Sequence, residues 1–291
     1  MIRPKAGFTL LELLVAISII AVLVGLVLSA VQNVRSSAQK TACANQLRQL
    51  ALALQQSHDV NGRFPPGTHN QWGAQPYASW IARILPQLEQ EAAWRAFVED
   101  YQKQIIFVGP PPHRNLARPF ATVLCPLGHK QVATTDDNIT AAFTYYLGNS
   151  GQHSVKKDGI LYLDSKVKIA DVTDGLSQTI LIGERPPSPD HHFGWWYAGV
   201  GQQRDGSADY LLGVRETNQS FRAPTCPKNG YDFRNGNLND MCDTFHFWSL
   251  HNGGANFAFA DGSVRFLSYS ANEILPALAT RAGGEVVAVP E

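Results

Sequence analysis

The chain has 291 residues, enough for one large domain or two small ones, and its acidic and basic residues balance at 24 each. Charged residues make up only 16% of the chain and form no long basic face, so we expect no nucleic acid partner. The four cysteines form no Cys-x-x-Cys pair, which argues against a zinc ribbon or a thioredoxin-like site.

The N-terminus joins a short basic segment to a long apolar one. Residues 1–7 carry Arg3 and Lys5, and residues 8–30 are almost wholly apolar. A helix over 8–30 is roughly 35 Å long, which is enough to span a bilayer. The basic residues before it predict a cytoplasmic start, with the C-terminal bulk on the other side. The apolar run is too long for an ordinary signal peptide, and no small-residue cleavage pattern closes it.

Glu12 is the one charge inside this apolar run. An ionisable residue within a membrane helix is costly and by default marks a function and a partner. If the chain is cut after Gly7, the new amine of Phe8 on a neighbouring subunit becomes the expected counter-charge. The alternative is a signal anchor in which Glu12 reaches the membrane surface.

Residues 5–15 read KAGFTLLELLV and resemble the cleavage and methylation site of type IV prepilins and type II secretion pseudopilins. The resemblance implies that a prepilin peptidase cuts after Gly7 and methylates the Phe8 amine. It implies that residues 1–7 are a leader, and that residues 8–30 anchor the chain in the inner membrane with a periplasmic domain. It also implies that Glu12 guides the chain into a filament of like or related subunits, either a pilus or a pseudopilus, which can reach the cell surface.

A second helical segment follows the apolar one. No proline or glycine interrupts residues 31–57, and an apolar stripe at helical spacing runs through them, formed by Cys43, Leu47, Leu50 and Leu54. We predict that the membrane helix continues as an amphipathic helix over 31–58. Its stripe packs on the globular domain, residues 59–291, although a coiled-coil partner could use the same stripe.

For the globular part, the sequence predicts short helices and strands. We expect a helix over 79–101 that Pro86 divides, and strands at 161–163, 167–169 and 179–182. The overall prediction is an α+β fold, with the long N-terminal helix packed on an antiparallel sheet. An aromatic and histidine-rich segment is either buried or a platform for carbohydrate; it contains His191, His192, Trp195, Trp196 and Tyr197.

Residues 255–267 predict a β-hairpin, because Asp261 and Gly262 stand between two alternating runs. A two-residue turn sets Phe259 opposite Val264 and Phe257 opposite Phe266, with all four side chains on one face. In this interpretation Asp261 is a turn residue and His251 lies at the loop that enters the first strand.

Further motifs resemble those of a large bacterial prepilin-like family of unknown function along nearly the whole chain. They are NQLRQL at 45–50, GRFPPG at 62–67, LCP at 124–126, IADVTDGLS at 169–177, GERPP at 183–187, and a C-terminal His-x9-Asp-Gly signature matched by His251, Asp261 and Gly262. The resemblance implies family membership and location.

An even number of cysteines in an exported domain suits two disulfides, and four buried thiols are the alternative. We predict that Cys43 pairs with Cys125, because Cys43 lies on the inward stripe of the helix. We predict that Cys226 pairs with Cys242, because the two flank a loop-rich stretch with little apolar content.

Two groups of residues are candidate metal ligands. Asp243 and His246 lie near His251 and Asp261 in the sequence, and Asp171 and Asp174 are candidate calcium ligands. We favour structural hydrogen bonding for both groups and expect no metal and no cofactor.

Catalytic signatures are missing from the sequence. It holds no Gly-x-Ser-x-Gly elbow, no P-loop and no dinucleotide fingerprint, so we expect no enzyme. A filament subunit is the main functional prediction. A membrane-tethered periplasmic protein that binds glycan or solute is the alternative.

Overall fold

A computed structural model describes residues 10–285 and residue 287. It divides into two compact units, Met1–Thr41 and Ala42–Glu291. One α-helix, α1 (Leu10–Asn61), supplies the described residues of the first unit and the opening residues of the second. The boundary between the units falls inside the predicted amphipathic continuation, eleven residues after its expected start at residue 31.

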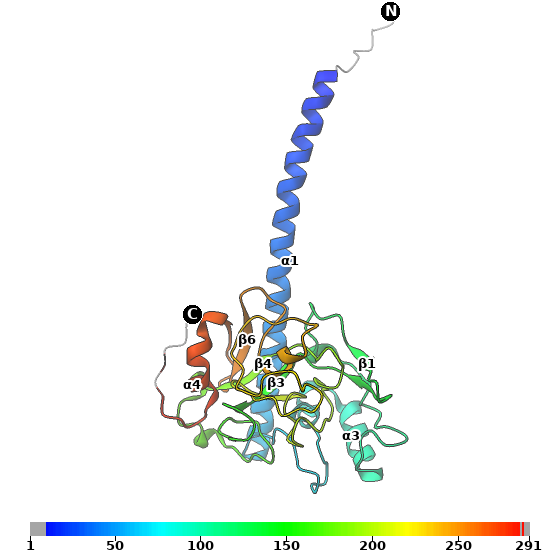
Figure 1. The fold of residues 1–291 in the computed structure, drawn as a ribbon, viewed down its shortest axis with the longest axis vertical. Helices are drawn as coiled ribbons and strands as arrows, with labels where there is room; N and C mark the ends of the chain where they lie inside the picture. Colours follow the sequence, from blue (N-terminus) through cyan, green and yellow to red (C-terminus); the bar gives the residue numbers. More distant parts are fainter. Residues whose placement is uncertain (1–9, 286, 288–291) are drawn as a thin grey trace, which may run out of the picture. The chain divides into compact units, whose positions relative to one another are not determined.

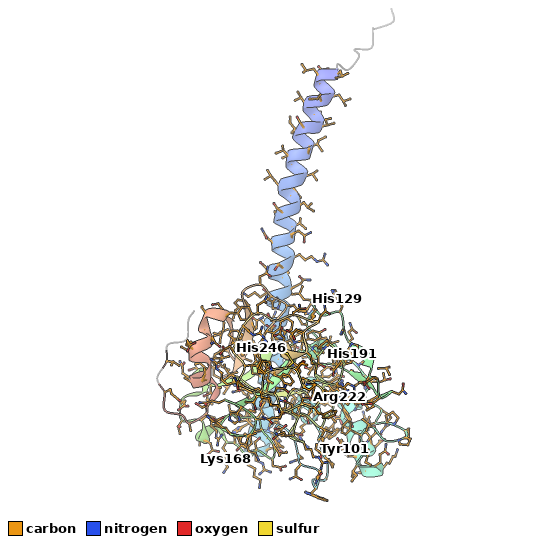
Figure 2. All side chains as sticks on the ribbon, viewed as in Figure 1. Tyr101, His129, Lys168, His191, Arg222 and His246 are labelled. Atoms are coloured by element: carbon orange, nitrogen blue, oxygen red, sulfur yellow. A yellow bond between two sulfur atoms is a disulfide. The ribbon has the colours of Figure 1, made fainter. Side chains whose placement is uncertain are left out.

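Within the first unit, the side chains of α1 project from every side of the helix (Figure 2). The large apolar residues from Leu10 to Val34 are all exposed. Sequence alone explains the helix, because leucine, isoleucine, valine and alanine fill it and no proline interrupts it. A helix that is apolar all round is typical of a membrane span.

Within the second unit, α1 becomes amphipathic as predicted. Its buried residues are Cys43, Leu47, Leu50, Ala51, Ala53, Leu54 and Ser57. The helix ends at Asn61, where Gly62 takes a positive φ of 69° and its amide donates to the His58 carbonyl over 2.7 Å. Glycine is suited to this position because it has no Cβ to clash in the left-handed region. The prolines at 65 and 66 then prevent the helix from resuming.

The predicted division of the next helical segment is confirmed. Helix α2 (Trp80–Arg83) is followed by a 3₁₀ turn, η1 (Pro86–Leu88), and by α3 (Glu91–Lys103). The Ser79 hydroxyl caps α2 by accepting from the Ala82 amide over 3.0 Å. Pro86 opens η1 because its fixed φ suits the first position of a helical turn.

The central sheet has five strands in the order β5-β3-β4-β6-β7. Their bounds are Tyr146–Gly151 for β3, Ile180–Glu184 for β4, Leu211–Gly213 for β5, Gly254–Phe259 for β6 and Val264–Ser268 for β7. Every neighbouring pair is antiparallel except β3 and β5, which run parallel. A separate two-stranded sheet pairs β1 (Val132–Thr134) with β2 (Thr140–Ala142). The predicted α+β class is confirmed.

Strands β3, β4 and β6 are buried along their whole length because the sheet is covered on both faces. One face, with Leu181, Ile182 and Ala258, joins the apolar cluster that contains the buried stripe of α1. The other face, with Ile180, Phe257 and Phe259, packs with helix α4 (Leu275–Ala279). Figure 1 shows α4 beside the sheet.

Two of the predicted strands are wrong. Residues 161–163 make one isolated bridge, Leu163 with Thr68, and no ladder. The segment predicted at 167–169 leads into a 3₁₀ turn, η3 (Ile169–Asp171), because the Asp171 carboxylate accepts from the Lys168 amide over 2.8 Å and closes the chain on itself. The third predicted strand, 179–182, corresponds to β4.

The hairpin forms where predicted, but its predicted register is wrong by one residue. Ala258 stands opposite Val264 and Phe257 opposite Arg265. The Phe259 amide bonds the Ser263 carbonyl and the Gly262 amide bonds the Phe259 carbonyl, so the loop has three residues, 260–262. Gly262, at φ +83°, takes the left-handed position that such loops require. The shift places Arg265, instead of Phe266, on the face of Phe257, and its guanidinium lies 4.6 Å from the Phe259 ring centre.

Candidate functional site

The predicted processing residues Gly7 and Phe8 lie outside the described residues. Glu12 lies in the first turn of α1 and its side chain is exposed. The hydroxyl of Ser18 donates to the Val15 carbonyl over 2.7 Å, and that of Ser29 donates to the Leu26 carbonyl over 2.9 Å. These polar residues thus satisfy their donors within the helix, as a lipid environment requires. By length and composition, α1 is able to cross a membrane.

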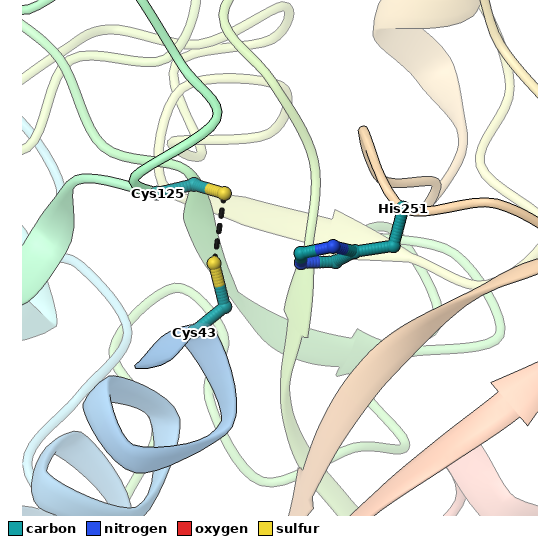
Figure 3. A group of neighbouring side chains, drawn as sticks. All are labelled: Cys43, Cys125 and His251. Carbon is teal, nitrogen blue, oxygen red and sulfur yellow. Dashed lines mark hydrogen bonds between the residues drawn. The ribbon is translucent and has the colours of Figure 1, made fainter. Parts of the chain in front are cut away.

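A second constellation lies in the interior of the globular unit. Cys43 comes from α1, Cys125 follows the 3₁₀ turn η2 (Ala121–Val123), and His251 precedes β6. One ligand atom from each residue lies within 4.8 Å of the other two, and all three residues are buried. Figure 3 shows the two thiols pointing toward each other and the imidazole ring pointing toward them. The two Sγ atoms are 2.8 Å apart. Three segments far apart in the sequence therefore meet at one buried cluster, which we call the cysteine cluster.

Glu184 lies behind the cysteine cluster, at the end of β4. Its Oε1 is 3.5 Å from His251 Nε2, and both side chains are buried. Asn256 on β6 fixes this carboxylate, since its backbone amide donates to Oε2 over 2.6 Å and its side-chain amide lies 3.2 Å from both oxygens. Glu184 belongs to the GERPP motif at 183–187, and the sequence alone gives this carboxylate no partner. Its pairing with His251 depends on the antiparallel ladder of β4 and β6, for which the local sequence carries no signal.

The cluster changes the pKa of each of its members. The hydrogen bond between the two thiols and burial raise the pKa of Cys43 well above its usual range. The hydrogen bond with Cys43 and the nearby imidazole of His251 outweigh burial and lower the pKa of Cys125 to about 6. Burial opposes the charged form of His251, but Cys125 and Glu184 together outweigh burial and raise its pKa to about 9. The two shifts have opposite directions, so Cys125 releases its proton more readily than an ordinary thiol and His251 holds a proton more tightly than an ordinary imidazole.

The residues of the predicted C-terminal signature lie in two different parts of the structure. Asp261 and Gly262 form the hairpin loop, where the Asp261 carboxylate accepts from the Ser263 amide over 2.8 Å. His251 belongs to the cysteine cluster and, among the described residues, shares no metal-type group with Asp261, Asp243 or His246. The turn role predicted for Asp261 is confirmed, whereas the part that His251 plays beside the cysteines was missed.

Most of the chain matches models of known protein families. Residues 32–273 match the family model described as "Protein of unknown function (DUF1559)". The chain belongs to this family. Residues 2–28 match the model described as "Prokaryotic N-terminal methylation motif", so the protein is prepilin-like. No curated protein and no solved structure matches the chain.

One predicted cysteine pair of this prepilin-like protein is confirmed as a disulfide and the other is not. Cys226 and Cys242 are bonded, with Sγ atoms 2.03 Å apart. Cys43 and Cys125 are neighbours, as predicted, but they are free thiols. Helix packing brings the inward stripe of α1 against the loop at Cys125, so the geometric part of the prediction holds while the bond is absent.

The remaining metal candidates of the prepilin-like chain make structural contacts. Asp243 accepts from His246 Nε2 over 2.8 Å, from Arg234 over 2.6 Å and from the Asn237 amide over 2.7 Å. Asp174 accepts from the Gly283 amide over 2.7 Å and the Gly284 amide over 2.9 Å. Asp171 caps η3, as described above. These carboxylates thus hold loops and turns together.

The aromatic segment of the prepilin-like chain is interior. Trp195, Trp196 and Tyr197 are buried. The indole of Trp196 donates to the Arg118 carbonyl over 2.7 Å, and the Tyr197 hydroxyl lies 2.8 Å from His113 Nδ1. Trp196 and Tyr197 thus pack the core, whereas Trp195 and the half-buried His192 also line a pocket at the surface. The buried interpretation is confirmed for Trp195, Trp196 and Tyr197, which lie outside the named strands, but not for His191 and His192, which are half-buried.

Proposed function

We propose that this protein is a filament subunit, which a prepilin peptidase cuts after Gly7 and which assembles through its N-terminal helix into a pilus or a secretion pseudopilus. Before assembly, residues 8–30 anchor it in the inner membrane with the N-terminus in the cytoplasm and the globular domain in the periplasm. Its partners are the peptidase and like or related subunits. Its role is structural, with no catalytic step.

The observation that carries this proposal is the surface of α1 in the first unit. Every large apolar side chain from Leu10 to Val34 is exposed, and within 8–34 the sequence holds a single charge, Glu12. So much exposed apolar surface requires another apolar environment. A bilayer supplies one before assembly, and the same helices of neighbouring subunits supply one in a filament. The methylation motif over the same residues supports this second environment.

The periplasmic position of the domain has separate support. Disulfides form and persist in oxidising compartments, and the domain holds the Cys226–Cys242 bond. Arg3 and Lys5 precede the apolar segment, which favours a cytoplasmic N-terminus. Both observations indicate the same orientation.

Replacing Glu12 tests the assembly step. We expect Glu12→Ala to be cleaved after Gly7 like the unaltered chain but to fall at least tenfold in sheared filament fractions. The reason is that the Phe8 amine of one subunit loses its counter-charge on the next, in surroundings where an unpaired charge is costly. Mass spectrometry of the N-terminus measures cleavage, and immunoblotting of sheared fractions measures assembly.

Ser18→Ala is the matched control for this experiment. Ser18 is a polar residue of the same apolar helix, but its hydroxyl is satisfied within the helix, so we expect normal cleavage and assembly. Normal incorporation of Glu12→Ala into filaments would contradict the pairing. Recovery of the unaltered protein solely as an inner-membrane monomer would contradict the filament proposal and favour a tethered binding protein.

A further inference from the structure

The cysteine cluster joins a helix to a loop; it is buried, but the loop reaches the surface one residue away from it. Cys43 is the first buried residue along α1, and it lies 82 positions from Cys125 in the sequence. Pro126, the neighbour of Cys125, is exposed. Groups at the edge of a core open locally more easily than groups at its centre. A covalent bond at this position would therefore fasten α1 to the domain at the point where its buried stripe begins.

The surroundings of the two cysteine pairs differ. Cys226 and Cys242 are already bonded. Cys43 and Cys125 lie 2.8 Å apart with His251 beside them and Glu184 behind His251 at 3.5 Å. A thiolate paired with a cation is a better leaving group in thiol–disulfide exchange, and it stabilises the reduced state of its pair. The imidazole next to Cys125 supplies such a cation once it accepts a proton.

We propose that Cys43, Cys125 and His251 form a reversible thiol–disulfide site that exchanges with an exported protein of the dithiol–disulfide class, with His251 accepting the proton of Cys125. Glu184 is a positioning residue, which holds the imidazole and balances its charge. The disulfide locks α1 onto the domain, and reduction removes this covalent lock. The proposal rests on the periplasmic position proposed above and on such an exchange partner, and it does not depend on filament assembly.

The oxidation step balances in atoms and electrons. The Cys125 thiolate attacks one sulfur of the partner's disulfide, so that a mixed disulfide forms and the partner's second sulfur leaves as a thiolate. That thiolate takes the proton of Cys43, whose sulfur then attacks Cys125 Sγ and displaces the partner's first sulfur. This last thiolate takes the proton held by His251. The two cysteines lose two electrons and two protons, and the partner's disulfide gains them as a dithiol.

A metal ion is the other occupant that two cysteines and a histidine can accept. Two thiolates on one zinc ion, each about 2.3 Å from the metal in tetrahedral geometry, stand roughly 3.7 Å apart. The sulfur separation of 2.8 Å is well below that value. The Cys226–Cys242 disulfide also indicates an oxidising compartment, in which neighbouring thiols pair. Both observations favour exchange over a metal site.

The test measures the midpoint reduction potential of each pair separately in the full chain, held in detergent micelles at pH 7. The protein is equilibrated with mixtures of reduced and oxidised dithiothreitol, and free thiols are alkylated. Peptide mass spectrometry then measures the reduced fraction of each cysteine pair. We expect Cys43–Cys125 to be reduced at a higher potential than Cys226–Cys242 in the unaltered protein. This order alone tests the proposal, even if a variant fails to fold.

His251→Gln tests the role of the imidazole. Without its cation the reduced pair loses stabilisation, so the equilibrium constant for oxidising Cys43–Cys125 should rise by a factor of roughly 3 to 10, which lowers the midpoint by about 15 to 30 mV. The Cys226–Cys242 midpoint should stay fixed and reports on folding in the same molecule. His129→Gln is the matched control, since His129 is exposed and only four residues from Cys125, and it should move neither midpoint.

Three results would overturn the proposal. One is a Cys43–Cys125 midpoint equal to or below that of Cys226–Cys242. Another is a His251→Gln variant whose Cys43–Cys125 midpoint does not move while the other pair is intact. The third is a reduced chain that binds one equivalent of Zn²⁺, or of Co²⁺ with a sulfur-to-metal absorption band, through Cys43, Cys125 and His251. That last result would assign a metal centre in place of an exchange site.

Discussion

Helix α1 has two halves that differ in what surrounds their apolar side chains. In the first unit, Leu26 is 64% exposed, and the large apolar residues on all sides of the helix are exposed with it. In the second unit, Leu50 is 0% exposed, and its neighbours on the stripe share one core with the sheet. Backbone geometry is the same in both halves, so the difference lies in the side chains around the helix.

This contrast shows what can cover the apolar side chains of each half. The second half carries one apolar stripe, and the other residues of its own chain cover it. The first half is apolar all round, so one sheet face cannot cover it, and only a bilayer or several other helices can. In one helix, the apolar residues of the second half are covered by the same chain, whereas those of the first half need a bilayer or other helices to cover them.

Blocking the cleavage at Gly7 should have the largest effect on the first half. We expect Gly7→Val to leave the leader attached, because the peptidase needs a small residue before the cut, and assembly should then be lost altogether. The uncleaved chain would stay in the membrane and would not enter a filament. Mass spectrometry of the N-terminus and sheared filament fractions measure the two effects. A mature chain that still begins at Phe8 would contradict the cleavage site, as would an unaltered protein that begins at Met1 or near Ala30.

The same truncation made in each half should sharpen the contrast. We expect Leu50→Ala to lower the free energy of unfolding of the domain by about 2 to 5 kcal/mol, through lost burial and the cavity that remains. Leu26→Ala should leave that free energy unchanged. Denaturant titration of the full chain in micelles can follow tryptophan fluorescence, because all six tryptophans lie in the second unit. Equal losses for the two variants would show that the first half also depends on the domain.

The fold class and the long helix could be predicted because their signals are local. Uninterrupted helix formers, a stripe at helical spacing and the Gly-Pro stop at 62–66 each operate within a few residues. The hairpin register failed because Asp-Gly fits both a two-residue and a three-residue loop. The choice depends on the Ala260 amide, which bonds the Thr179 carbonyl at the edge of β4 and is thereby taken out of the hairpin ladder.

The cysteine cluster was only half predictable for a similar reason. The stripe of α1 showed that Cys43 faces inward, which was enough to pair it with Cys125. No local signal joins His251 to these cysteines or Glu184 to His251, because β4, β6 and α1 bring them together only in the folded sheet. The sequence shows only that Glu184 follows a predicted strand and that His251 lies at the loop before the hairpin, and neither fact indicates the other residue as a partner.

The hairpin loop offers the smallest and most local test of the second half. Gly262 has a φ of +83°, and a Cβ there would lie 3.3 Å from Gln55 Nε2 on α1, whose amide donates to the Ala260 carbonyl over 2.8 Å. We expect Gly262→Val to lower the free energy of unfolding by about 1 to 3 kcal/mol, because a β-branched residue resists positive φ and crowds Gln55. Gly262→Asn is the matched control, since asparagine tolerates this φ, and it should lose clearly less. Denaturant titration distinguishes them: equal losses would assign the effect to the contact with Gln55, and no loss in either variant would contradict the three-residue loop with its left-handed glycine.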